Sequence, residues 1–358
     1  MQKLAMESKG SERKSGSVLS VKELAKQPMS AIPHRYLYLN QEPPLSGAVA
    51  CHQLPVINVN KLFSTRSADS ELQNLHSACK EWGFFQLVKH GVSSSVMKKL
   101  KHEIEEFFNL PLEEKMKFKV RSGEFEGFGT VDRPDDKLDW GDRLFFTINP
   151  IHKRKPHLFP ALPSSLRNAL ESYYSEIHNL GMRILGLMAK ALRMDANEMS
   201  QVFEDGQQLV RINYYPPCPQ PELVVGLRPH SDGGGLTILN QVNGVDGLQI
   251  KKDGLWIPVN FLPDALVVNV GDILEIMSNG VYKSVEHRAT INSREERISL
   301  ALFINSKLEA EVGPARSLIN SKNPPLFMTV GMEDYLKSFF SRKLDGKTNI
   351  ECMKITHN

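Results

Sequence analysis

The pattern of hydrophobic and polar residues changes character partway along the chain. Apolar residues recur at three- and four-residue steps in 70–82, 93–109 and 164–194, which predicts amphipathic helices. Short apolar runs at 54–59 and 84–88 predict two strands, one before and one after the first of these helices. The first half of the chain is therefore expected to alternate strand and helix.

From residue 209 onward, short strand-like runs separated by tight turns replace the helical spacing. The turn Asp253-Gly254, between two such runs, is a strong hairpin signal. Strands this short and this regularly spaced favour a double-sheet jelly roll. The predicted fold is mostly β with flanking helices, a double-stranded β-helix (jelly-roll) core and an α/β N-terminal region. The predicted strands are 209–215, 236–241, 248–252, 255–260, 265–270, 272–277, 284–290 and 297–305.

The same pattern predicts five regions. The polar, proline-broken stretch 1–50 is expected to be an extended arm, partly disordered, with one short helix at 21–27. Residues 124–142 are rich in Gly, Asp and Pro and predict a loop. The five regions are an arm (1–50), an α/β region (51–163), a supporting helix and linker (164–205), a jelly-roll core (206–310), and a C-terminal helix (333–341) and tail over the barrel mouth (311–358).

Composition narrows the class of protein. The 358 residues are 41% hydrophobic and carry a net charge of +3, which is typical of a soluble globular protein and too small for a nucleic-acid binder. No apolar run approaches the roughly 18 residues of a membrane span. The N-terminus has no apolar signal region, and the four cysteines form no C-x-x-C pair, so reduced thiols are expected. We predict a cytoplasmic monomer without nucleic-acid or membrane partners.

Three residues in the second half suggest a metal site. His230 and Asp232 are two residues apart, so on an extended strand their side chains share one face. Three glycines follow Asp232 and leave room for a sharp turn. With His287 from a later strand, they would form the two-histidine, one-carboxylate face typical of non-haem Fe(II) oxygenases.

A second pair lies ten residues beyond His287. Arg297 and Ser299 are again two apart on one face, and an arginine beside a hydroxyl suits the capture of a carboxylate. A metal site followed by such a clamp predicts that the partner of the metal is a small acid.

This H-x-D…H…R-x-S pattern resembles the plant 2-oxoglutarate/Fe(II)-dependent dioxygenases, in the senescence-related and codeine- and thebaine-O-demethylase-like branch. The resemblance extends from about residue 50 to 348. Its further motifs are Ala78-Cys-Lys-Glu-Trp-Gly-Phe-Phe-Gln86, Phe107-Phe-Asn-Leu-Pro111, Glu126-Gly-Phe-Gly129, Asn213-Tyr-Tyr-Pro-Pro-Cys-Pro-Gln-Pro221, Asn269-Val-Gly-Asp272 and Lys343-Leu-Asp-Gly346.

The resemblance implies a role for each motif residue. His230, Asp232 and His287 would bind Fe(II), and Arg297 and Ser299 would hold the distal carboxylate of 2-oxoglutarate. Tyr215 would assist them, and Asn213 would lie near the metal-chelating end. The resemblance also implies O2 as co-substrate, ascorbate as reductant, and hydroxylation of a substrate carbon; an O-methyl group attacked in this way leaves as formaldehyde. Halogenating relatives lack the carboxylate, so Asp232 argues for hydroxylation.

The substrate is expected to be flat and aromatic. Phe145 and Phe303 match positions that line the pocket in relatives, although core packing is an equal alternative; Leu144, Phe146 and Asn305 are weaker candidates. We predict hydroxylation or O-demethylation of a small aromatic specialised metabolite, such as an alkaloid or phenolic. The rival functions are oxidation of a small plant hormone and a catalytically silent jelly-roll binding protein.

Three positions depart from the family pattern. Lys89-His-Gly91 replaces a common Asn-His-Gly and is interpreted as structural. Arg228 stands where small residues are usual, and would either contact an oxygen of the substrate or form an ion pair at the rim. Asn240 replaces an aliphatic residue, and would either reach the pocket or hydrogen-bond a neighbouring strand.

Overall fold

The computed structural model describes residues 20–29, 31–39, 41–43, 53–129, 137–341 and 346–355. Several predictions fall elsewhere: the disorder expected at the start of the arm, Cys51, residues 130–136 of the predicted loop, and residues 343–345 of the last motif lie outside the described residues. No disulfide joins the cysteines that the structure describes, Cys79, Cys218 and Cys352.

The first part of the chain alternates helix and strand, as predicted. The strand β2 (Phe84–Val88) has the predicted bounds and pairs in parallel with β1 (Val56–Asn58). The helices in this first part of the chain are α1 (Val21–Ala25), α2 (Val59–Leu62), α3 (Ala68–Glu81), α4 (Ser94–Asn109) and α5 (Leu112–Met116).

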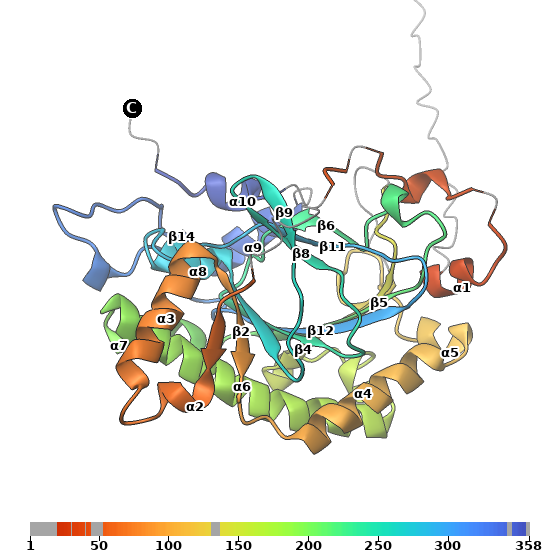
Figure 1. Ribbon diagram of the computed structural model, residues 1–358, viewed down its shortest axis with the longest axis horizontal. Helices are drawn as coiled ribbons and strands as arrows, with labels where there is room; N and C mark the ends of the chain where they lie inside the picture. Colours follow the sequence, from red (N-terminus) through yellow and green to blue (C-terminus); the bar gives the residue numbers. More distant parts are fainter. Residues whose placement is uncertain are drawn as a thin grey trace, which may run out of the picture.

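Two sheets form the jelly-roll core, which confirms the predicted fold class. The larger sheet has eight strands in the order β1-β2-β10-β7-β12-β5-β4-β3, and the smaller has four in the order β6-β11-β8-β9 (Figure 1). The other strands of these two sheets are β3 (Gly127–Phe128), β4 (Asp142–Asn149), β5 (Gln208–Tyr215), β6 (Leu227–His230), β7 (Leu236–Gln241), β8 (Leu248–Lys252), β9 (Leu255–Pro258), β10 (Leu266–Val270), β11 (His287–Ala289) and β12 (Arg297–Ile304).

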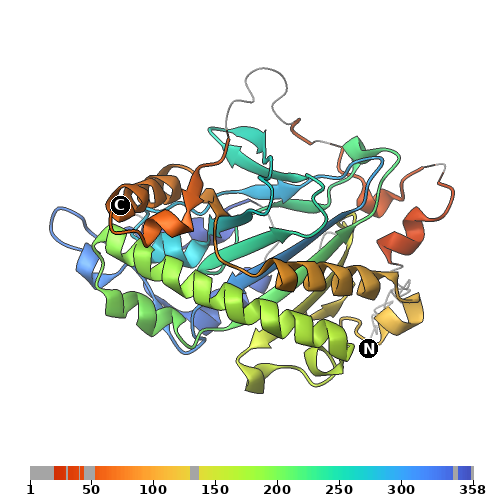
Figure 2. The same ribbon diagram turned by 60° about the horizontal axis from the view of Figure 1, so that its bottom comes forward.

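The long helix α6 (Ser164–Leu192) supports the larger sheet from outside. It lies beside α3 and α4, and these three helices cover the outer face of the sheet (Figure 2). Its apolar stripe, with Leu170, Ile177 and Ile184, is fully buried in the main hydrophobic core. The remaining helices and strands are α7 (Ala196–Phe203), α8 (Asp272–Met277), α9 (Met332–Ser341), α10 (Thr348–Glu351), β13 (Glu311–Val312), β14 (Val330–Gly331) and the 3-10 turns η1 (His34–Tyr36), η2 (Ile151–Lys153), η3 (Phe159–Ala161), η4 (Pro221–Leu223) and η5 (Arg316–Leu318).

The prediction of a strand at 272–277 is wrong, because this segment is the helix α8. All six of its residues are buried, including the acids Asp272 and Glu275, and a segment of six residues is too short for its periodicity to separate strand from helix. The Asp272 backbone N–H donates to the Asp232 carbonyl at 2.7 Å, so α8 begins directly beneath the turn that carries the predicted metal ligand.

Alternation along the strands gives the larger sheet two distinct faces. In β12, Leu300 and Leu302 pack against the helices, while Arg297, Ser299 and Phe303 face the smaller sheet. In β4, which was not predicted as a strand, Leu144 and Phe146 belong to the helix-side core. The interior between the two sheets is therefore the place where the predicted site residues meet.

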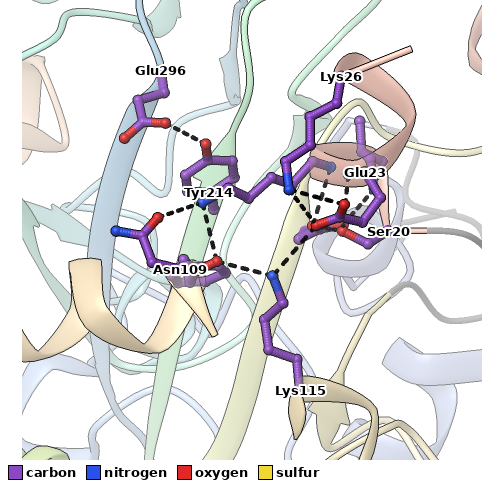
Figure 3. A network of polar contacts seen from close by, with 11 residues as sticks. Ser20, Glu23, Lys26, Asn109, Lys115, Tyr214 and Glu296 are labelled. Atoms are coloured by element: carbon purple, nitrogen blue, oxygen red, sulfur yellow. Dashed lines mark hydrogen bonds and ion pairs between the residues drawn. The ribbon is translucent and has the colours of Figure 1, made fainter. Parts of the chain in front are cut away.

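The N-terminal arm is fastened to the outer face by a polar network (Figure 3). Ser20 caps α1, and its hydroxyl donates to Asp142, which also accepts the Val21 backbone N–H at 2.7 Å. Lys115, a fully buried lysine, donates to the Phe108 carbonyl at 2.9 Å. The structure thus buries charge on this side of the sheet to hold a terminal segment.

Across the part of the chain that the structure describes, no helix combines the length and the hydropathy needed to cross a membrane.

Candidate metal and co-substrate site

The three predicted metal ligands come together between the sheets. His287 lies opposite His230 in the pairing of β11 with β6, and Asp232 follows two residues after β6 ends at His230. Asp232 Oδ1 lies 3.6 Å from His230 Nε2 and 3.7 Å from His287 Nε2. The three potential ligand atoms all lie within 4.8 Å of one another, and all three residues are buried.

Both histidines are oriented by backbone carbonyls. His230 Nδ1 lies 2.7 Å from the Arg228 carbonyl, and His287 Nδ1 lies 3.1 Å from the Val285 carbonyl. Since a carbonyl only accepts, each Nδ1 carries a proton, and Nε2, which faces Asp232, is the ring nitrogen left to bind a metal. Burial lowers the pKa of His287 to about 4, so its imidazole is neutral, as a metal ligand requires.

Asp232 uses its two oxygens differently. Oδ2 accepts hydrogen bonds from Thr237 Oγ1 at 2.6 Å and Asn269 Nδ2 at 2.7 Å, while Oδ1 faces the histidines. Burial by itself raises the pKa of this carboxyl, but the positive charge of the histidines when they are protonated, and the hydrogen bonds from His230 and Thr237, outweigh burial and hold the pKa below its usual range. The carboxylate is therefore ionised, with one oxygen directed toward the two Nε2 atoms. This donor set fits a divalent iron ion.

The glycines after Asp232 allow the turn to pack closely. A Cβ atom on Gly234 would lie 1.9 Å from Asn305 Oδ1, and one on Gly235 would lie 2.2 Å from the Phe203 ring. The structure therefore places Asn305 against the turn that carries Asp232. Behind it, the Ser231 backbone N–H donates to the Gly346 carbonyl at 3.2 Å, so the C-terminal segment borders the same turn.

The predicted carboxylate clamp faces the same interior space from the larger sheet. The Arg297 guanidinium lies 5.4 Å from the centre of the Tyr215 ring, and its Nη2 donates to Gln241 Oε1 at 3.4 Å. Its Nε is buried and has no hydrogen-bond partner among the described residues, nor does any of their carboxylates pair with it. Burial lowers the pKa of Arg297, so an anion that reached this donor would be bound strongly. The opposed Ser299 and Asn213 are joined by a hydrogen bond of 3.4 Å.

The candidate substrate residues separate into two groups. Phe145 and Phe303 face the interior and meet edge to face, with ring centroids 6.3 Å apart. Phe125 continues this wall, with its centroid 6.0 Å from that of Phe145. Leu144 and Phe146 point to the opposite, helix-covered face, so we leave them out of the proposed pocket.

The two unusual polar residues both contact protein groups. Arg228 Nε pairs with Asp139 Oδ1 at 3.2 Å, and its Nη2 donates to the Lys137 carbonyl, which favours the ion-pair interpretation. Asn240 Nδ2 lies 3.6 Å from Met97 Sδ, on the helix side of β7. Its side chain therefore faces away from the interior, and it too is left out of the proposed pocket.

Three interior residues escaped the sequence interpretation. Thr237 and Asn269 bind the second oxygen of Asp232, and Arg211 faces the interior from β5, where its Nε donates to Asn213 Oδ1 at 2.7 Å. A polar residue at an alternate position of an apolar strand is the signal that could have identified each of them.

Comparisons with known proteins agree with this geometry. Residues 206–306 match the 2OG-Fe(II) oxygenase superfamily, and residues 54–162 match the family described as non-haem dioxygenase in morphine synthesis N-terminal. The chain is 50% identical to the oxoglutarate-dependent flavonoid 7-O-demethylase 1 of Ocimum basilicum, an alignment that covers 94% of this chain and 91% of the relative. It is 49% identical to the codeine O-demethylase of Papaver somniferum, with 95% and 96% covered.

A comparison with solved structures indicates the same family. The crystal structure of JOX2 in complex with 2OG, Fe and JA superimposes with a TM-score of 0.85 at 34% identity, covering 95% of this chain and 98% of that chain. The resemblance identified from the sequence motifs is thereby confirmed. The chain belongs to the 2OG-Fe(II) oxygenase superfamily and is an oxidoreductase of the kind that uses Fe(II) and 2-oxoglutarate.

Proposed function

We propose that this enzyme hydroxylates or oxidatively O-demethylates a small aromatic metabolite, an alkaloid or a phenolic. Two kinds of support carry the proposal. The flavonoid and codeine O-demethylases named above are about half identical to this chain over nearly its whole length. Within the molecule, the single most informative observation is Arg297, a buried cation whose Nε has no partner among the described residues and which faces the interior between the sheets, as the predicted iron ligands do.

In this proposal His230, Asp232 and His287 hold Fe(II) through two nitrogens and one carboxylate oxygen. Arg297, Ser299 and Tyr215 bind the distal carboxylate of 2-oxoglutarate, and Asn213 lies near its chelating end. The neutral imidazole of His287 and the ionised carboxylate of Asp232 are the protonation states that such a metal requires. Thr237 and Asn269 fix the carboxylate so that its Oδ1 is directed to the metal.

The bound iron and co-substrate supply the oxidising chemistry. With O2, 2-oxoglutarate would be converted to succinate and CO2, and the second oxygen atom of O2 would enter a C–H bond of the substrate. When that bond belongs to an aryl methoxy group, the hemiacetal formed breaks down to a phenol and formaldehyde. The residues of the chain orient the methoxy group and exclude water, and the aromatic wall of Phe125, Phe145 and Phe303 suits a flat ring.

Further properties belong to the same proposal. Ascorbate would keep the iron reduced, and the enzyme would act as a cytoplasmic monomer without nucleic-acid or membrane partners. The net charge of +3 over 358 residues supports the absence of nucleic acid.

The test is turnover with Fe(II), ascorbate, 2-oxoglutarate and a panel of methoxylated alkaloids and flavonoids. We expect succinate, formaldehyde and the phenol in equal amounts from at least one member. A hydroxylated product without formaldehyde would assign hydroxylation instead. Absence of succinate, with and without substrates, would favour the silent binding protein.

A further inference from the structure

The turn that carries two of the predicted metal ligands is bordered by the C-terminal segment, residues 346–355. β6 is the edge strand of the smaller sheet and has β11 on one side. Gly346 also lies beside β6, where it forms an isolated parallel bridge with His230. Its N–H donates to the Pro229 carbonyl at 3.4 Å, and its carbonyl accepts the Ser231 N–H at 3.2 Å. The C-terminal segment therefore continues the sheet at the first metal ligand.

The helix α9 reaches the same turn through a buried carboxylate. Tyr335 Oη and Ser231 Oγ each donate to Asp272 Oδ2 at 3.2 Å. These three residues are at most 3% exposed. The Phe339 ring, also on α9, lies against the turn, because a Cβ atom on Gly233 would lie 2.6 Å from it. Asp272 thus joins the residue between the two metal ligands to the helix α9.

A second buried acid on α8 binds the residue that follows Gly346. Lys347 Nζ pairs with Glu275 Oε2 at 2.9 Å, and the Glu275 side chain is only 6% exposed. The same oxygen accepts the Ser284 backbone N–H at 2.6 Å. Removing the cation from a buried carboxylate is costly, so this ion pair holds the start of the C-terminal segment against α8.

The turn between β6 and β7 depends on α8 for its own conformation. Three glycines follow Asp232, and glycine loses more conformational freedom on folding than any other residue. The carbonyls of Asp232 and Gly234 accept the N–H groups of Asp272 at 2.7 Å and of Ile273 at 3.0 Å. The short helix that supports the turn is therefore the one to which both C-terminal side chains bind.

We propose that Tyr335 and Lys347 are positioning residues for the iron site, and that Fe(II) binding and docking of the C-terminal segment stabilise each other. The inference rests on the proposed iron ligands, but not on the choice of substrate. With the segment docked, His230 and Asp232 are already held in the arrangement that binds the metal; with the segment released, only a fraction of molecules has that arrangement, and the apparent affinity falls. Because such coupling is reciprocal, Fe(II) slows release of the segment by the factor by which docking tightens Fe(II) binding.

The experiment titrates Fe(II) alone, without oxygen and 2-oxoglutarate, so that no turnover contributes. Lys347→Met leaves Glu275 without its cation and should weaken Fe(II) binding roughly tenfold. Tyr335→Phe removes only a hydroxyl and should weaken it roughly threefold, which decides the matter if the lysine variant does not fold. Hydrogen exchange of the peptide 346–355 is followed in metal-free and Fe(II)-loaded protein. Fe(II) should slow this exchange roughly tenfold in wild type and by a smaller factor in Lys347→Met.

Two control variants separate positioning from general stability. Lys347→Arg keeps the ion pair and should restore both the Fe(II) affinity and the metal-dependent slowing of exchange. Lys354→Met removes a lysine of the same segment whose ion pair with Glu351 is exposed, and should leave the Fe(II) affinity unchanged.

The outcomes distinguish this inference from the proposed function. Faster exchange in Lys347→Met by the same factor with and without Fe(II), at unchanged Fe(II) affinity, would overturn the inference and make the contacts purely structural. O-demethylation by an enzyme whose C-terminal exchange does not respond to Fe(II) would overturn the inference alone. Coupled Fe(II) binding in a protein that turns over no member of the substrate panel would contradict the proposed function alone.

Discussion

Two buried aspartates, Asp232 and Asp142, lie on opposite sides of the larger sheet. Their side chains are similarly hidden, with 7% and 2% of the residue exposed, and each accepts several hydrogen bonds. Asp232 faces the interior between the sheets, whereas Asp142 lies in β4 on the outer face beneath the N-terminal arm. The two show how burial of the same group can serve different ends.

The difference lies in what each oxygen contacts. Both oxygens of Asp142 are taken by the arm: Oδ1 accepts the Val21 N–H at 2.7 Å, and Oδ2 accepts the Ser20 hydroxyl and the Lys22 N–H. Burial raises the pKa of Asp142 in spite of these bonds. In Asp232, Thr237 and Asn269 take one oxygen, the other faces two histidines, and the pKa is lowered. An oxygen held toward other ligand atoms distinguishes the metal carboxylate from the structural one.

The largest effect is expected for Asp232→Ala. Loss of the only carboxylate ligand should abolish Fe(II) binding and reduce turnover to background, while the fold persists. Metal content after gel filtration and succinate release measure the two effects. Full activity in this variant would contradict the assignment of the triad.

For the outer aspartate, Asp142, we expect a loss of stability without a loss of Fe(II) binding. In Asp142→Ala the Val21 and Lys22 N–H groups and the Ser20 hydroxyl lose their acceptor, which should lower the free energy of unfolding by about 3 kcal/mol. Denaturant unfolding measures this change in the free energy of unfolding. The Fe(II) affinity of the folded fraction should be unchanged. A loss of iron as large as that in Asp232→Ala would show that the two sites are not independent.

The sequence predicted the inner site better than the outer one. His230, Asp232 and His287 were identified because two-residue spacing on a strand fixes a common face, and because the motifs resemble a known family. Their supports Thr237 and Asn269 were not, since each becomes a partner of Asp232 only when β7 and β10 fold against its turn. The Ser20–Asp142 contact joins residues 122 positions apart and carries no local signal.

The error in the fold has a different cause. The segment 272–277 was predicted as a strand because all six residues of this helix are buried, the acids Asp272 and Glu275 included, and six residues are too few to reveal the helical period. For Arg228 the sequence left two alternatives open, a contact with the substrate or an ion pair. Its contacts with Asp139 and the Lys137 carbonyl favour the ion pair, and they come from a loop whose position the sequence does not give.

Arg297→Met tests the second half of the inner site. Removing the buried guanidinium should raise the KM for 2-oxoglutarate by roughly 10- to 100-fold, because a charge-assisted pair is lost. Steady-state kinetics at varied 2-oxoglutarate measures this, and Fe(II) affinity should stay at the wild-type value, in contrast to Asp232→Ala. Equal losses of iron and 2-oxoglutarate binding would make Arg297 structural, as Asp142 is.

A smaller effect is expected at the oxygen of Asp232 that faces away from the metal. Thr237→Val removes one of its two hydrogen bonds and should weaken Fe(II) binding by about tenfold, since outer partners of a metal ligand orient it. Thr237→Ser keeps the hydroxyl and is the control. Unaltered iron affinity in the valine variant would mean that Asn269 alone suffices to hold the carboxylate.

The smallest effect concerns pH, where the two aspartates should differ in slope. Asp142 has a raised pKa in the folded state, so the native protein binds its proton more readily than the unfolded chain does. The stability of wild type relative to Asp142→Asn should therefore rise as the pH falls from neutrality toward the ordinary value of 3.8. Asp232 has a lowered pKa, so it stays ionised in both states above that value, and the stability of wild type relative to Asp232→Asn should be flat between about pH 7 and pH 5. Denaturant unfolding of the metal-free proteins at several pH values measures both differences. Parallel slopes would show that the two carboxyls share one electrostatic environment, contrary to the opposite directions of their pKa shifts.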